Sequence, residues 1–157
     1  MSSAPFDIDL AIQRLAGELG KALQQVRGAA DYASITDFQS FRPPEAFALL
    51  VNERAASGQA AGSTGSASTA KARQPAIVEF GVVLAVQNAR YQRGAPAVRD
   101  AMPLIGKVRD ALIGWQPPGL SLARPVMWRS GRVIGYDAGV LLWGDVFTTQ
   151  HSIGSKP

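Results

Sequence analysis

The sequence contains no cysteine, a single histidine (His151) and no long apolar run. Without cysteine the protein has no disulfide, no thiolate metal site and no cysteine nucleophile. Every apolar run is shorter than the roughly 18 residues that cross a bilayer. The N-terminus, MSSAPFDIDL, lacks the basic and apolar regions of a signal peptide. We therefore expect a protein that is made in the cytosol and held together by packing or by assembly.

The residue patterns that catalysis needs are also missing. His151 lies in the polar end of the chain, where we expect it to be solvated. Gly58, Gly62 and Gly65 are not followed by Gly-Lys-Ser/Thr, so they match neither a P-loop nor a dinucleotide fingerprint. The chain has no Gly-x-Ser-x-Gly elbow, and its acids show no metal-ligand spacing. We predict that the protein is not an enzyme and has no catalytic residue, no metal and no cofactor.

Basic residues are in excess, but they are dispersed along the chain. The formal net charge is +4, but no run of five or six basic residues forms a nucleic-acid tract. A nucleic-acid-binding module therefore stays an alternative, and it predicts steeply salt-dependent binding by the isolated protein.

What the chain does have is enough apolar residues for one folded domain. Its 157 residues are 46% hydrophobic, which predicts a single domain over residues 1–157. Residues 57–74 stand out because they contain no apolar side chain larger than alanine. They separate two strand-like runs, 47–55 and 75–88, so we predict a hairpin with a long tongue. The tongue is either a flexible insertion or a segment that orders against a partner.

Apolar periodicity predicts two helices. The first runs from about Asp7 to Arg27, with Gly28 in a left-handed position after its end. The second runs from about Pro96 to Ile113, and Pro103 kinks it or marks a fresh start.

Alternating residues and turn signals predict the remaining strands. A short irregular strand occupies 32–41, and strand pieces follow at 125–129, 132–137 and 140–149. We expect a flexible C-terminal tail from about residue 150. The predicted fold is α+β, an antiparallel sheet with two helices packed on it and the long hairpin tongue.

The run VLLWGDVF within 140–149 is apolar on both strand faces, so it needs two covers. Helices supply one cover. In a chain of this size, a neighbouring subunit is a candidate for the other.

Two segments carry a resemblance to a known family: VRDALIGWQPP at 108–118 and GRVIGYDAGVLLWGDVFTT at 131–149. Together with the N-terminal helix and the hairpin, they resemble the tail terminator proteins of long-tailed bacteriophages, in particular the Mu-like branch. The resemblance spans about residues 7–149. Its anchors are Leu112 to Pro117, Tyr136, Asp137, Gly139, Val140, Trp143 and Phe147.

The resemblance implies a virion structural protein of the tail-neck region, assembled in the host cytoplasm. Such a subunit forms a hexameric ring that caps the tail tube, stops tube polymerisation and docks head-completion or neck proteins. DNA passes through the bore without sequence-specific binding. The alternatives are a head-tail connector or neck ring, or the terminator of a contractile tail-like particle. Because aromatic and arginine side chains dominate protein interfaces, we predict as contact residues Arg42, Trp115, Arg129, Tyr136, Asp137 and Trp143.

Overall fold

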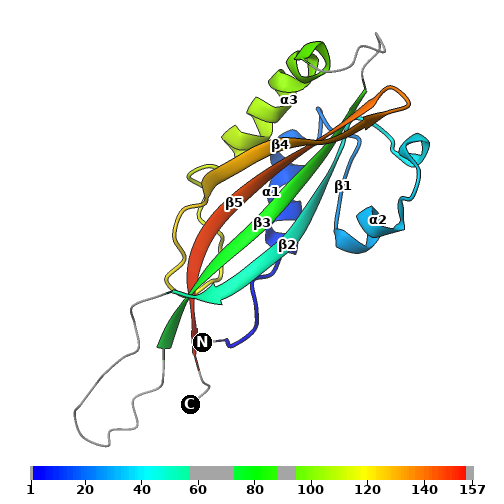
Figure 1. The fold of residues 1–157 in the computed structure, drawn as a ribbon. Helices are drawn as coiled ribbons and strands as arrows, with labels where there is room; N and C mark the ends of the chain where they lie inside the picture. Colours follow the sequence, from blue (N-terminus) through cyan, green and yellow to red (C-terminus); the bar gives the residue numbers. More distant parts are fainter. Residues whose placement is uncertain (1, 57–72, 88–94, 155–157) are drawn as a thin grey trace, which may run out of the picture.

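The computed structural model describes residues 2–56, 73–87 and 95–154. The elements follow in the order α1 (Asp9–Leu19), β1 (Gln25–Arg27), α2 (Ala29–Ser34), the 3-10 helix η1 (Phe38–Ser40), β2 (Glu45–Ala55), β3 (Arg73–Gln87), α3 (Ala95–Leu112), β4 (Met127–Asp137) and β5 (Val140–Gly154). The strands form one sheet in the order β1-β2-β3-β5-β4 (Figure 1). Only the three-residue β1 runs parallel to its neighbour. The α+β class is confirmed, although the sheet is mixed and the described chain holds three α-helices rather than two.

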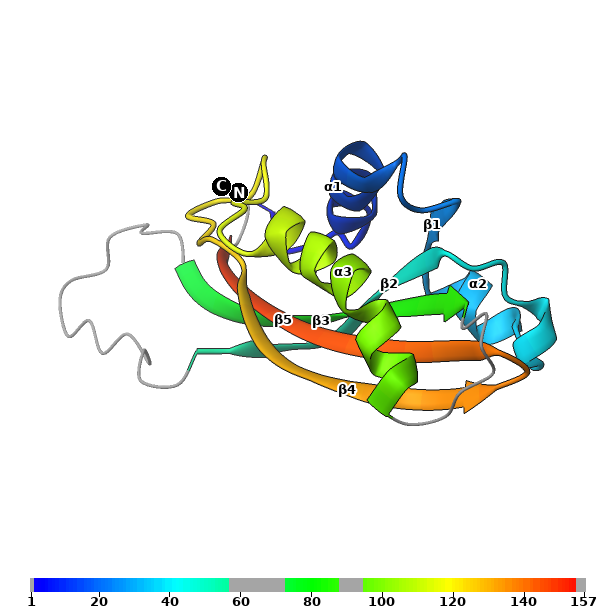
Figure 2. The same cartoon turned by 90° about the horizontal axis from the view of Figure 1, so that it is seen from above.

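One face of the sheet, the helix face, is covered by α1 and α3 (Figure 2). Alternate residues of β3, such as Phe80 and Val82, point into this main core. Phe80 stacks between Phe6 and Phe147, with ring centroids 5.7 and 5.6 Å apart. The core therefore joins the N-terminal segment to the two central strands.

Among the described residues, the opposite face, the far face, is covered at one end only. There Tyr32, Phe38 and Phe41 from the segment after β1 pack over Phe47 and Leu142 in a second buried cluster. The strand predicted to be apolar on both faces is β5, and this segment is its second cover. At the Leu142 end the cover comes from the chain itself and not from a neighbouring subunit.

The first helix is shorter than predicted. α1 ends at Leu19, and a turn leads into β1, where Gln25 pairs with Glu45. Leu23 and Val26 continued the apolar spacing because both still pack on the main core, one from the turn and one from the strand. Gly28 is not left-handed; it precedes α2 in an extended conformation with φ −105°.

The predicted strand at 32–41 was wrong. This stretch forms the end of α2 and then η1, where Asp37 accepts a hydrogen bond from the Gln39 N–H at 3.0 Å. Its apolar residues recur at every third position, and all four cover the far face: Tyr32, Ile35, Phe38 and Phe41.

The C-terminal third is more regular than predicted. The predicted pieces 125–129 and 132–137 are joined in one strand, β4, which begins at Met127. The predicted break is absent, and the pairing with β5 is irregular between Trp128 and Ser130 and between Val133 and Gly135. β5 continues to Gly154, so the flexible tail expected from residue 150 was wrong for 150–154. α3 runs through Pro103 without a fresh start.

The predicted tongue falls largely outside the described residues. Arg73 and Gln74 at its end are the first residues of β3, where Arg73 pairs with Gly154. The flanking strands β2 and β3 are antiparallel neighbours, as the hairpin prediction requires.

Candidate assembly surface

The predicted contact residues do not gather at one place. Three lie on the side of the main core: Trp115, Tyr136 and Trp143 are half-buried and pack against it. The guanidinium of Arg14 lies 5.9 Å from the centre of the Trp115 ring. The structural contacts of these rings are therefore clear, and a role in partner contacts stays a prediction.

The other three predicted residues are exposed. Arg129 on β4 forms an ion pair across the far face with Glu79 of β3. Asp137 ends β4, and its carboxylate accepts a hydrogen bond from the Ala138 N–H at 2.8 Å. Arg42 follows η1, and its backbone N–H donates to Glu45 at 2.8 Å. These residues lie on the far face, at the β4–β5 turn and before β2, respectively.

Sequence reasoning missed a polar cluster built around Asp145. Asp145 Oδ1 accepts hydrogen bonds from Arg109 Nη2 at 2.9 Å and from the indoles of Trp128 and Trp143, each at 3.1 Å. Oδ2 accepts from Arg109 Nε at 3.0 Å. The carboxylate is 2% exposed, and the guanidinium lies over the Trp128 ring at 4.6 Å. The one local signal in the sequence was Trp143, which lies two residues before Asp145 and so on the same strand face, whereas Trp128 lies seventeen residues earlier.

This cluster fixes α3 to β4 and β5. The hydrogen bond with Asp145 raises the pKa of Arg109, burial acts in the opposite direction, and the charge of Asp145 adds to the increase. Arg109 therefore stays cationic under ordinary conditions. A bidentate pair with all donors satisfied positions an element, whereas it offers no free group for chemistry.

One further buried acid and the buried histidine also anchor the fold. Glu45 is fully buried and receives Arg27 Nη2 at 2.9 Å. His151, predicted to be solvated, is 3% exposed on β5, and its Nε2 lies 3.0 Å from Glu53 Oε1. The other oxygen of Glu53 accepts the Phe6 N–H at 2.8 Å. The only histidine is thus part of a structural contact between β2, β5 and the N-terminal segment.

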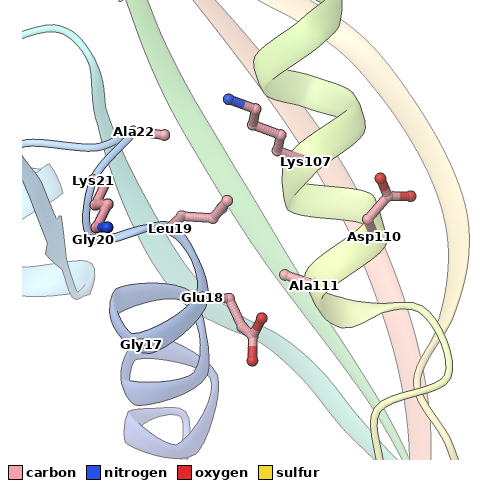
Figure 3. A pocket seen from close by; sticks show the side chains of 9 residues that line it. All are labelled: Gly17, Glu18, Leu19, Gly20, Lys21, Ala22, Lys107, Asp110 and Ala111. Atoms are coloured by element: carbon pink, nitrogen blue, oxygen red, sulfur yellow. The ribbon is translucent and has the colours of Figure 1, made fainter.

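A cavity of about 540 Å³ lies between α1 and α3. Figure 3 shows Leu19 and Lys107 extending into it from the two helices, with Glu18 and Asp110 at its margin. Glu18 is already paired with Arg14 at 2.9 Å. Nowhere among residues 2–56, 73–87 and 95–154 do three metal-ligating side chains come together.

The uncovered end of the far face is the part of the sheet that has the character of an interface. We call it the open face. It combines exposed apolar side chains, Val51 at 57% and Met127 at 55%, with the half-buried Ile77 and Val146. Strand register also places Arg54 and Arg132 there, beside the pair formed by Arg129 and Glu79. Mixed apolar and arginine surface is typical of protein interfaces.

The edge strand β4 extends this surface. Its outer edge has no neighbouring strand in the described sheet. Large apolar side chains are exposed on both of its faces, with Trp128 and Val133 on the helix face and Met127 and Ile134 on the far face. An exposed edge with apolar side chains on both sides favours association with another chain.

A model of one protein family, described as phage tail terminator protein, matches the chain over residues 1–157. The chain belongs to this family. A phage tail terminator is a structural component of the virion tail, and the family therefore implies a non-enzymatic role. The resemblance to tail terminators is thereby confirmed, while the Mu-like branch stays a prediction. In a search of curated proteins, no sequence matched the chain.

The geometry of this tail terminator agrees with a structural role. Its buried ionisable groups have charged partners, and several of its exposed apolar side chains, such as Val51 and Met127, lie on the open face or along β4. None of the helices in the described parts of the chain is both long and apolar enough to cross a membrane.

Proposed function

We propose that this protein forms a ring, with six subunits, that caps the tail tube and stops tube polymerisation. The ring then provides the docking surface for head-completion or neck proteins, and DNA passes through its bore without sequence-specific binding. The family assignment supports the place in the tail. The assembly role rests on the open face, the uncovered end of the far face, where arginines surround exposed apolar side chains.

Capping is a consequence of two different surfaces on one ring. One surface of the ring binds the last tube ring, and the other offers no equivalent site for a further tube subunit. Head-to-tail contacts between subunits close into a ring when the rotation between neighbours divides a full turn. The contact residues that we propose are still Arg42, Trp115, Arg129, Tyr136, Asp137 and Trp143.

Electron microscopy of tails assembled with and without the protein tests this function. We expect tails of uniform length with the protein and overlong tubes without it, and adding the purified protein to growing tubes should restore uniform length. Unchanged tail length together with a failure to join heads would assign the protein to the neck instead.

A further inference from the structure

The open face has a counterpart on the same chain. Next to the covered end of the far face lies a groove of about 350 Å³, lined mainly by apolar side chains such as Phe38 and Ile134 and by Asp37. We call it the acidic groove. η1, which follows Asp37, lies beside the β4–β5 turn in both views of the fold (Figures 1 and 2), and that turn carries Asp137.

The charges at the acidic groove differ in sign from those of the open face. Asp31, Asp37 and Asp137 are exposed, and none of the three forms an ion pair with another described residue. Arg42 is an exposed cation nearby, and Arg132 borders the groove two residues from Ile134. One end of the far face therefore carries mainly free carboxylates around apolar side chains.

The open face carries the opposite excess. Arg54 on β2 and Arg132 on β4 are exposed, and neither forms an ion pair within the described chain. Arg124, which lines a cavity of about 190 Å³ with Ile77 and Met127, adds a third cation. The single acid that strand register places on this surface, Glu79, is used by Arg129.

We propose that the acidic groove of one subunit binds the open face of the next copy of this chain. This inference rests on the proposed ring and names the surfaces that close it. Both surfaces combine apolar side chains with charges of opposite sign, so their contact buries apolar area and pairs each charge excess with its complement. The two surfaces differ, so the contact is head-to-tail, as a closed ring requires.

The composition of the open face favours a protein over DNA as its occupant. A surface for the phosphate backbone is dominated by cations, whereas here Val51, Ile77 and Met127 lie among the arginines and Glu79 neutralises one of them. A copy of the same chain is favoured over an unrelated protein because the matching charge excess is present on the chain itself.

Two charge-reversed proteins test the proposal. The base-reversed protein carries Arg54→Glu and Arg132→Glu, and the acid-reversed protein carries Asp31→Lys and Asp37→Lys. The matched control carries Arg99→Glu and Asp110→Lys on α3, where both side chains are exposed on the other side of the sheet. Circular dichroism and thermal unfolding establish that each variant is folded. Cross-linking and native mass spectrometry then measure assembly of the full chain, both free and bound to tail tubes.

We expect each reversed protein alone to assemble at least about tenfold more weakly than the native chain, and the control to assemble normally. A 1:1 mixture of the two reversed proteins should restore rings, because subunits that alternate around a ring with an even number of members place opposite charges at every contact. Reversal of Asp37 also removes the acceptor for the Gln39 N–H. Asp37→Asn, which keeps that acceptor and removes the charge, should give a smaller loss of assembly.

The outcomes separate this inference from the proposed function. If the native chain assembles and the base-reversed protein assembles equally well, these surfaces do not form the contact, although the ring stands. If the native chain forms no oligomer, either free or on tubes, the ring itself is wrong. If base reversal leaves assembly unchanged but abolishes salt-dependent binding of double-stranded DNA, the occupant is nucleic acid and the inference is overturned.

Discussion

At the scale of single residues, the molecule depends on a few buried carboxylates with several donors each. Asp145 receives four hydrogen bonds from three side chains of α3, β4 and β5. Such a group is costly to bury but costlier to leave unpaired once its donors are in place. The effect of a mutation on stability therefore depends on whether it leaves a buried charged partner without its counter-charge.

We expect Asp145→Asn to destabilise the fold by about 3 to 5 kcal/mol, because it leaves the Arg109 guanidinium partly buried without its counter-charge. Glu18→Gln is the matched control. It breaks the exposed ion pair with Arg14 and should cost about 0.5 kcal/mol or less. Urea unfolding followed by circular dichroism measures both. Equal stability of the two variants would show that the Asp145 cluster does not anchor α3.

Gly131 should be intolerant of any side chain for a related reason. A Cβ at this position would lie 2.8 Å from Arg109 Nη2 and 2.9 Å from Trp143 Cζ2, and it would also contact Asp145 Oδ1. These atoms are held by hydrogen bonds and cannot move aside independently. We expect Gly131→Ala to destabilise the fold by about 1 to 3 kcal/mol.

The same substitution at Gly106 provides the control, because a Cβ there meets no atom within 4 Å. Gly106 lies inside α3, where alanine is favoured over glycine by up to about 1 kcal/mol. Thermal unfolding should therefore move in opposite directions for the two Gly→Ala variants. A stabilising Gly131→Ala would mean that β4 is free to move away from α3.

At the scale of elements, periodicity predicted the central strands and α3 well and the chain ends poorly. β2, β3 and α3 were predicted to within a few residues because each has one sustained pattern. The first helix was extended too far because Leu23 and Val26 keep an apolar spacing while leaving the helix. Residues that face one core from two different elements cannot be told apart by spacing alone.

The end of β5 shows a second limit of sequence reasoning. Gln150 to Gly154 contain polar residues and a histidine, which predicted a tail, yet β3 continues beside them and supplies the pairing. His151 is buried through a contact with Glu53, ninety-eight positions earlier in the chain. Likewise the Asp145 cluster depends on α3 crossing two strands, and no local pattern encodes that contact.

The placement of His151 can be tested by two alanine substitutions. His151→Ala removes the partner of Glu53 and an edge contact with the Phe6 ring at 6.5 Å, so we expect a loss of about 1 to 3 kcal/mol. The adjacent Gln150→Ala changes a half-buried residue on the other face and should cost less than about 0.5 kcal/mol. Chemical unfolding measures both losses. If both changes are small, residues 150–154 behave as the tail that the sequence suggested.

At the scale of the whole molecule, the two faces of the sheet differ in how far the described chain covers them. In the described parts of the chain, α1 and α3 cover most of the helix face, and the segment containing Phe38 and Phe41 covers one end of the far face. The aromatic residues of that segment pack on the sheet, whereas Asp31 and Asp37 are exposed to solvent. One stretch of chain thus completes the fold and forms the acidic side of the proposed contact.

The salt dependence of assembly follows from this arrangement. Charges of opposite sign on two separated surfaces accelerate encounter at low ionic strength, and screening weakens them as the Debye length falls from about 10 Å at 0.1 M to about 3 Å at 1 M. We expect the rate of ring formation to fall steeply over this range, while rings already formed dissociate slowly because their apolar contacts are not screened. Light scattering after rapid mixing measures the rate.

The control for the rate measurement is the 1:1 mixture of base-reversed and acid-reversed proteins. Half of its contacts have both signs exchanged and half are native, so the attraction between subunits is kept and its salt dependence should match that of the native chain. Each reversed protein alone should instead assemble faster as salt rises, because screening relieves repulsion. A native rate that does not change with salt would mean that apolar contacts alone guide the subunits together, and that the arginines of the open face serve another partner.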